Sequence, residues 1–125
     1  MSEVAIMVST TALDDYFGGY DGRISFVKMD IQGAEHAALC GMQRLLKANR
    51  AAKIMTEFWP AGLRESGVEP GDYLRMLISR GFRLFDLNEA KGKVVPTSSP
   101  ELLKELRSGR RTSANLLCVR DRALE

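Results

Sequence analysis

Short apolar runs alternate along this 125-residue chain with longer stretches of helical periodicity. Residues 24–29, 51–58, 82–87 and 115–119 are each rich in β-forming residues and are bounded by turn-forming or polar residues, which predicts four strands. Residues 4–8 form a further short β-compatible run, which we also predict to be a strand. Strands that alternate with helices of 10 to 15 residues are typical of an α/β fold built around a layered sheet.

The helical stretches lie between these strands. In residues 34–47 the apolar side chains fall on one face of a helix. Pro70 suits the first turn of a second helix, which Gly81 ends. A third helix is predicted over residues 99–108. The segments 61–69 and 88–99 are expected to be loops, because glycine or polar residues dominate them.

The strand at residues 24–29 ends abruptly in Asp30, and Gly33 marks a tight turn before the next helix. Units of strand, turn and helix bind ligands just outside the carboxyl ends of their strands, which is where Asp30 falls. A carboxylate that ends an apolar strand must reach solvent, a cation or a hydrogen-bond donor. Asp30 is therefore the first candidate for chemistry, and the alternative is that it caps the helix after Gly33.

The next strand also ends in an acid, Glu57, followed by Trp59 and Pro60. Neighbouring strands lie about 5 Å apart, so we expect Asp30 and Glu57 to stand side by side at the edge of the sheet. Two adjacent carboxylates can share a divalent cation, or one can act as a general base. The alternative is that Glu57 is a surface acid that caps the turn at Trp59.

Further candidates surround these acids. Gln32 and Gly33 form the turn and bring backbone N–H groups towards a ligand. Glu35 and His36 begin the following helix, where an acid also suits the helix dipole and a lone histidine is often simply exposed. Trp59 is expected to wall an acceptor pocket or to serve in packing.

Composition sets limits on these interpretations. Hydrophobic residues make up 45% and charged residues 27%, as in soluble globular proteins, and the net charge of +2 is too small to indicate nucleic acid or an anionic membrane. No apolar run has the length of a membrane span. Cys40 and Cys118 lie in apolar patterns and are predicted to be buried thiols, which favours the cytoplasm. A single histidine excludes most zinc schemes, so no metal ligands are assigned.

Three ordered blocks carry a resemblance to a known family. The segment Lys28-Met-Asp-Ile-Gln-Gly-Ala-Glu35, with Ser9-Thr-Thr-Ala-Leu-Asp-Asp15 before it and Thr56-Glu-Phe58 after it, resembles the FkbM-type methyltransferases. These belong to the class I enzymes that depend on S-adenosylmethionine. Gln32 stands where the family more commonly has glutamate. The resemblance extends over roughly residues 9–119.

The resemblance implies a Rossmann-like class I methyltransferase sheet, of which this chain supplies the C-terminal portion. That portion has about four to five strands, mostly parallel with the last one antiparallel, and flanking helices. The implied reaction is O-methylation of a hydroxyl on a small acceptor, a sugar or a secondary metabolite, with S-adenosylmethionine as cofactor and a divalent metal as a weaker possibility. The roles are catalytic for Asp30 and Glu57, cofactor binding for Asp30, Gln32 and Gly33, and substrate binding for Glu35, His36 and Trp59.

The glycine-rich cofactor loop of the class I fold has no counterpart in these 125 residues. We therefore expect residues 1–125 to be a single partial domain that binds cofactor weakly or not at all by itself. The alternative is a catalytically silent, truncated α/β module that acts through dimerisation or a partner polypeptide. An exposed sheet edge at residues 24–29 predicts a homodimer, formed by edge pairing or by exchange of residues 4–8, or a partner that supplies the missing half.

Overall fold

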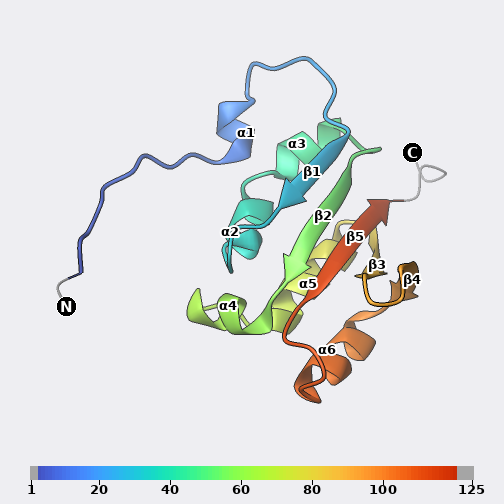
Figure 1. The fold of residues 1–125 in the computed structure, drawn as a ribbon. Helices are drawn as coiled ribbons and strands as arrows, with labels where there is room; N and C mark the ends of the chain where they lie inside the picture. Colours follow the sequence, from blue (N-terminus) through green and yellow to red (C-terminus); the bar gives the residue numbers. More distant parts are fainter. Residues whose placement is uncertain (1–2, 121–125) are drawn as a thin grey trace.

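The computed structural model describes residues 3–120. The strands of that part are β1 (Phe26–Met29), β2 (Lys53–Phe58), β3 (Phe82–Asn88), β4 (Lys93–Thr97) and β5 (Ala114–Arg120). They form one sheet in the order β1-β2-β5-β3-β4 (Figure 1). The helices of the same part are α1 (Leu13–Tyr16), α2 (Glu35–Cys40), α3 (Gln43–Ala48), α4 (Pro60–Glu65), α5 (Pro70–Ser79) and α6 (Ser99–Arg107). The α/β class predicted from the sequence is confirmed.

The prediction of a mostly parallel sheet is wrong. Within residues 3–120, β1 pairs with β2 in parallel, whereas β2–β5, β5–β3 and β3–β4 are all antiparallel. β2 and β3 run in the same direction, but β5 enters between them from the opposite direction. β4 then folds back on β3 as a hairpin, which adds another antiparallel pair at the edge.

The helices α2 to α6 pack on one face of the sheet. Side chains of that face alternate with those of the other face, so that Ile54 and Phe58 of β2 are buried while Met55 between them is only half-buried. The buried cluster combines this face with helix residues such as Leu39 and Leu102. In Figure 1, α3 and α5 lie behind β1 and β2. The opposite face of the sheet carries no helix from the described residues.

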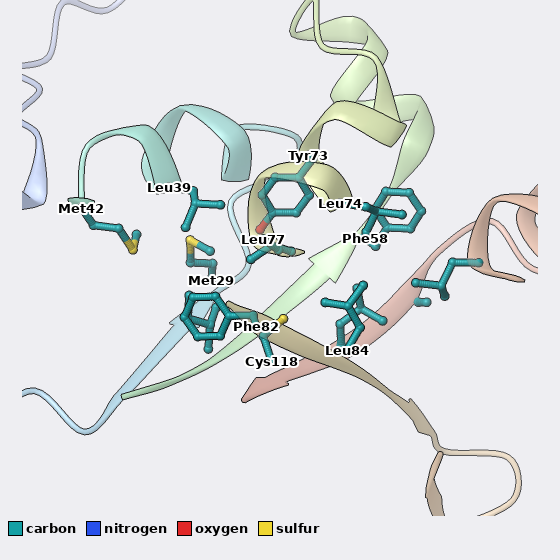
Figure 2. Close-up of a cluster of buried hydrophobic side chains, with 14 of the residues drawn as sticks. Met29, Leu39, Met42, Phe58, Tyr73, Leu74, Leu77, Phe82, Leu84 and Cys118 are labelled. Atoms are coloured by element: carbon teal, nitrogen blue, oxygen red, sulfur yellow. The ribbon is translucent and has the colours of Figure 1, made fainter. Parts of the chain in front are cut away.

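Figure 2 shows the centre of this core, where Tyr73, Leu74 and Leu77 of α5 lie over Phe58 of β2 and the strands β3 and β5. The only polar group of Tyr73, its hydroxyl, is hydrogen-bonded to the Thr56 hydroxyl at 2.7 Å. Burial raises the pKa of Tyr73, so that the phenol stays neutral. The core therefore contains a polar pair whose hydrogen bonding is satisfied.

Residues 34–47 form two helices and not the single helix predicted. The chain breaks at Gly41, whose carbonyl accepts a hydrogen bond from the Asp14 N–H at 2.8 Å. The Asp14 carboxylate in turn accepts from the backbone N–H groups of Arg44 and Leu45, at 3.0 and 2.8 Å, and so caps the start of α3. This cap comes from a residue distant in sequence, which helical periodicity does not reveal.

The predicted strand at residues 4–8 is wrong. The segment has no strand partner among the described residues, and its apolar side chains are exposed, with Met7 at 98%. In Figure 1 it runs away from the sheet before α1 begins. A β-compatible run forms a strand only when a neighbouring strand offers it hydrogen bonds.

Both predicted loops contain regular structure. In residues 61–69, α4 begins at Pro60, whose fixed φ angle suits the first turn of a helix. In residues 88–99, β4 forms a hairpin with β3, and the Asn88 side chain accepts a hydrogen bond from the Lys91 N–H at 3.1 Å in the turn. Each of these elements is short, which is why composition favoured a loop.

The other four predicted strands are confirmed. β1, β2, β3 and β5 lie within two residues of their predicted bounds. Cys118 is buried as expected, and burial raises its pKa to about 12, but Cys40 is exposed, so that prediction is wrong. Neither cysteine forms a disulfide. No helix within residues 3–120 is long and apolar enough to cross a membrane.

Candidate functional site

A cavity of about 310 Å³ lies where β1 and β2 end. Met29 and Thr56 are partners in the parallel ladder, so the residues that follow them, Asp30 and Glu57, stand next to each other at the edge of the sheet. The cavity is lined by Lys28, Met29, Asp30, Met55, Thr56, Glu57, Leu87, Glu89 and Asn115. The structure therefore brings the two strand-end acids together in one cavity.

The environment of Glu57 makes its carboxylate more basic than an ordinary glutamate. Its pKa is raised above the ordinary value of 4.5, chiefly because the half-buried side chain is partly removed from water. The negative charges of Asp30 and, to a smaller extent, Glu35 raise it further. A carboxylate with a raised pKa accepts a proton more readily, which suits a general base.

Asp30 is exposed, and its carboxylate accepts a hydrogen bond from the Gln32 side-chain amide at 3.2 Å. The alternative role as a helix cap does not apply, since α2 begins after Ala34 without any side-chain cap. Gln32 itself has a φ angle of +56°, a left-handed conformation that is uncommon for a residue other than glycine. This turn directs the Gln32 amide back towards Asp30.

Gly33 is required by the backbone. Its φ angle is +100°, and a Cβ atom at this position would lie 2.7 Å from the carbonyl carbon of Gly62. Gly62 in turn is covered by the Trp59 ring, which a Cβ atom on Gly62 would overlap. The turn that follows β1 is thus packed directly against α4, the helix that follows β2. Trp59 does not line the cavity, so its contacts are those of the packing alternative.

Glu35 is turned inwards and is only 1% exposed. Its two carboxylate oxygens accept the Gly33 N–H at 2.9 and 3.3 Å. The Gly33 N–H and the Glu35 carboxylate are thus bonded to each other, so this N–H is not available to a ligand. Glu35 instead fixes the turn that carries Gln32.

His36 also lies away from the cavity. It is half-buried, with its Nδ1 atom 4.0 Å from the Cys40 sulfur and its ring 6.3 Å from the Tyr73 ring, centroid to centroid. The proposed substrate-binding residues Glu35, His36 and Trp59 are therefore not gathered with Asp30 and Glu57. Their assigned roles stay predictions.

Two lining residues, Glu89 and Asn115, were missed from the sequence. Glu89 follows the end of β3, and an acid after a strand was the same signal that pointed to Asp30 and Glu57. Asn115 reaches this end of the sheet because β5 runs in the opposite direction and begins here. Within residues 3–120, no group of three or more histidine, cysteine or acidic side chains is arranged to hold a metal ion.

The sheet and its cavity define an α/β protein whose candidate site lies at the carboxyl ends of two parallel strands. The family model named Methyltransferase FkbM domain matches residues 2–84, which include both Asp30 and Glu57. The chain belongs to this family, as its sequence blocks predicted, and the match indicates a methyltransferase. No curated protein and no solved structure matches the chain.

Proposed function

We propose that this chain is a methyltransferase domain that uses S-adenosylmethionine to methylate a hydroxyl of a small acceptor, a sugar or a secondary metabolite. The observation that supports this most is the placement of Glu57, with its raised pKa, beside Asp30 in one cavity. Methyl transfer to a hydroxyl needs a group that accepts the hydroxyl proton as the oxygen attacks. Glu57 is the residue we assign to that step.

The cavity also suits the charge of the cofactor. When bound, S-adenosylmethionine supplies a methyl group attached to a positively charged sulfonium. The carboxylates of Asp30, Glu57 and Glu89 outnumber the one cation among the lining residues, Lys28, which favours a cationic group over a neutral or anionic one. Asp30 is the residue we assign to the cationic end of the cofactor, with Gln32 holding the Asp30 carboxylate in place.

In the proposed reaction the acceptor hydroxyl lies within hydrogen-bond reach of Glu57, which takes up the proton. Asp30 assists indirectly, because its negative charge raises the pKa of Glu57 and so makes it a stronger base. Met55 and Leu87 provide apolar walls that reduce access of water to the reacting groups. No metal ion is needed for these steps.

The test is transfer of a labelled methyl group from S-adenosylmethionine to a panel of hydroxylated acceptors, in the longest natural polypeptide that contains these residues. Asp30→Asn and Glu57→Gln keep the side-chain shapes but remove charge and basicity, so we expect both to abolish transfer. Glu65→Gln, an exposed acid on α4, is the matched control and should retain activity. Unaltered turnover in both site variants would contradict the proposal.

Cofactor binding can be measured separately by calorimetry on residues 1–125. We expect weak or undetectable binding, because these residues hold no glycine-rich loop for the methionine part. Tight binding with one cofactor per chain would show that this expectation is wrong. An activity that survives a chelator would likewise remove any essential role for a divalent cation between Asp30 and Glu57.

A second candidate is a catalytically silent module that acts by pairing with a second copy or with a partner polypeptide. The observation that favours it is the position of β1 at the edge of the sheet. The Ser25 carbonyl is directed towards β2, so the backbone groups of Phe26 and Lys28 face outwards, where no described residue bonds them. Light scattering tests this, since a monomer of 13.9 kDa at micromolar concentration would contradict self-association.

A further inference from the structure

A basic cavity lies at the end of the sheet opposite to Asp30 and Glu57. It has a volume of about 320 Å³ and is formed where α3, α5 and β5 end. Arg120, the last residue of β5, pairs with Phe82 at the start of β3, which places the cavity at the amino ends of the parallel-running strands. The polar side chains that line it are Gln43, Lys47, Arg50, Ser79, Arg80 and Arg120.

Two of these arginines are anchored to the ends of helices. The buried Arg120 donates hydrogen bonds to the carbonyls of Leu46 and Asn49, at 2.9 and 2.8 Å, and its guanidinium lies 4.7 Å from the centre of the Phe82 ring. Arg80 donates to the Leu39 carbonyl at 2.5 Å. Cations are favourable at helix C-termini because the last carbonyls are partly negative. Capping thus explains why these two arginines are fixed in place.

Lys47, in the last turn of α3, also suits a helix C-terminus, but no carbonyl within residues 3–120 accepts a hydrogen bond from the side chain of Lys47 or Arg50. Lys47 and Arg50 are exposed and add two more positive charges to the same cavity, which none of the acidic residues within 3–120 lines. Within residues 3–120, neither of them forms an ion pair with a carboxylate, and neither does Arg80. Arg44, Arg75 and Arg111, by contrast, all have acidic partners. Lys47, Arg50 and Arg80 bring three positive charges to one cavity, and like charges repel each other unless an anion joins them.

We propose that this cavity binds a small molecule that carries a phosphate group. A phosphate dianion offers the compact negative charge that lysine binds and the oxygen pairs that guanidinium groups bind in a bidentate manner. The Gln43 amide adds a neutral donor, and the cavity is large enough to hold a small organic group beside the phosphate. The cavity is remote from Glu57, so this inference stands apart from the proposed methyl transfer.

The test is calorimetric titration of the whole chain at low salt with inorganic phosphate and, separately, with ribose 5-phosphate. We expect saturable binding of both at millimolar concentration or below, which weakens as sodium chloride is added. Equal affinities would show that the phosphate alone is recognised, and tighter binding of the ester would show that the cavity also holds the organic group. The absence of saturable binding of both probes would overturn the proposal, even if a long polyanion binds.

Two double variants distinguish binding of phosphate at this cavity from a non-specific attraction of phosphate to a positively charged surface. Lys47→Gln with Arg50→Gln removes two exposed cations of the cavity, whereas Lys104→Gln with Arg107→Gln removes two exposed cations from the last turn of α6. The first pair should weaken phosphate binding by about tenfold or more, the cost of losing one charge-assisted contact, and the second should not. Equal losses in the two variants would overturn the proposal.

Nuclear magnetic resonance provides an independent readout that does not depend on any variant. Addition of phosphate should shift the amide signals of residues 43–50, 79–80 and 120, which surround the cavity. Signals near Asp30 and Glu57 should not move. Shifts spread evenly over the basic surface, without this cluster, would show that phosphate has no defined site here.

Discussion

The segment that follows β1 has an exposed half, Asp30 to Gln32, and a buried half, formed by Gly33 and Glu35. The two halves differ in what their side chains contact. Asp30 lines the cavity and Gln32 is exposed to solvent, and within residues 3–120 their side chains bond only to each other. Gly33 and Glu35 face the interior, where a buried carboxylate holds a buried N–H. One short stretch of sequence therefore contains residues on which chemistry depends and residues on which the fold depends. Substitutions in the two halves should have different effects.

The largest effect is expected for Gly33→Ala. An alanine there must adopt a φ angle of +100° and place its Cβ against the backbone of Gly62, which together should cost roughly 3 kcal/mol of unfolding free energy. Gly67→Ala is the control, because Gly67 has a φ angle of +80° but no atom near its Cβ position, and it should cost about 1 kcal/mol. Urea denaturation measures both. Equal losses would mean that the contact with Gly62 has no energetic role.

A smaller loss is expected for Glu35→Gln. The amide keeps the shape of the side chain but replaces a charged acceptor with a neutral one and introduces a buried NH₂ group, so we expect a loss of about 2 kcal/mol. The exposed Glu65→Gln variant should change stability by less than about 0.5 kcal/mol. If denaturation midpoints of the two variants coincide, the carboxylate of Glu35 does not hold the turn.

Glu57→Gln should increase the free energy of unfolding, unlike the two substitutions above. Because folding raises the pKa of Glu57, the charged carboxylate destabilises the folded protein, and this loss of stability is complete above the pKa that Glu57 has in the folded state. Removing the charge should therefore stabilise the protein at neutral pH. The gain should vanish as the pH falls below the ordinary value of 4.5. Thermal unfolding of both proteins across this pH range measures the difference, and a gain that persists in acid would exclude this cause.

The smallest effect on stability is expected for Asp30→Asn. Asp30 is exposed and bonds only to the Gln32 side chain, so unfolding free energy should change by less than about 0.5 kcal/mol. The charge of Asp30 nevertheless raises the pKa of Glu57, which should fall in this variant. Titration of the Glu57 carboxyl by nuclear magnetic resonance measures this shift. A pKa of Glu57 that does not move would mean that the two acids act independently.

The sequence predicted those elements that carry their own local signal. β2 and β3 were predicted from short runs of β-forming residues bounded by turn-forming or polar residues, and α5 from Pro70, Gly81 and the helical periodicity between them. The break between α2 and α3 was not predictable in this way, because it depends on Asp14, which caps α3 from a distant part of the chain. The prediction of a strand at residues 4–8 failed for the converse reason, since this run has local strand character but no strand partner within residues 3–120.

The candidate site shows the same division. Acids at the ends of parallel strands indicated that Asp30 and Glu57 would meet, and register alone brings them together. The position of an acid in the sequence does not, however, predict whether its side chain points to the solvent or into the core. Glu35 follows Asp30 closely in sequence yet points into the core, because the left-handed turn at Gln32 and Gly33 reverses the chain between them.

The position of β5 has a consequence for synthesis of the protein. β5 is the last strand of the described chain, yet it lies between β2 and β3 and is hydrogen-bonded to both. While residues 114–120 are still inside the ribosome, the strand that joins β2 to β3 is absent, so these two strands cannot be connected in one sheet. Completion of the described sheet therefore waits for β5, and until then the edges of β2 and β3 that β5 covers lack their hydrogen-bond partners, which favours aggregation.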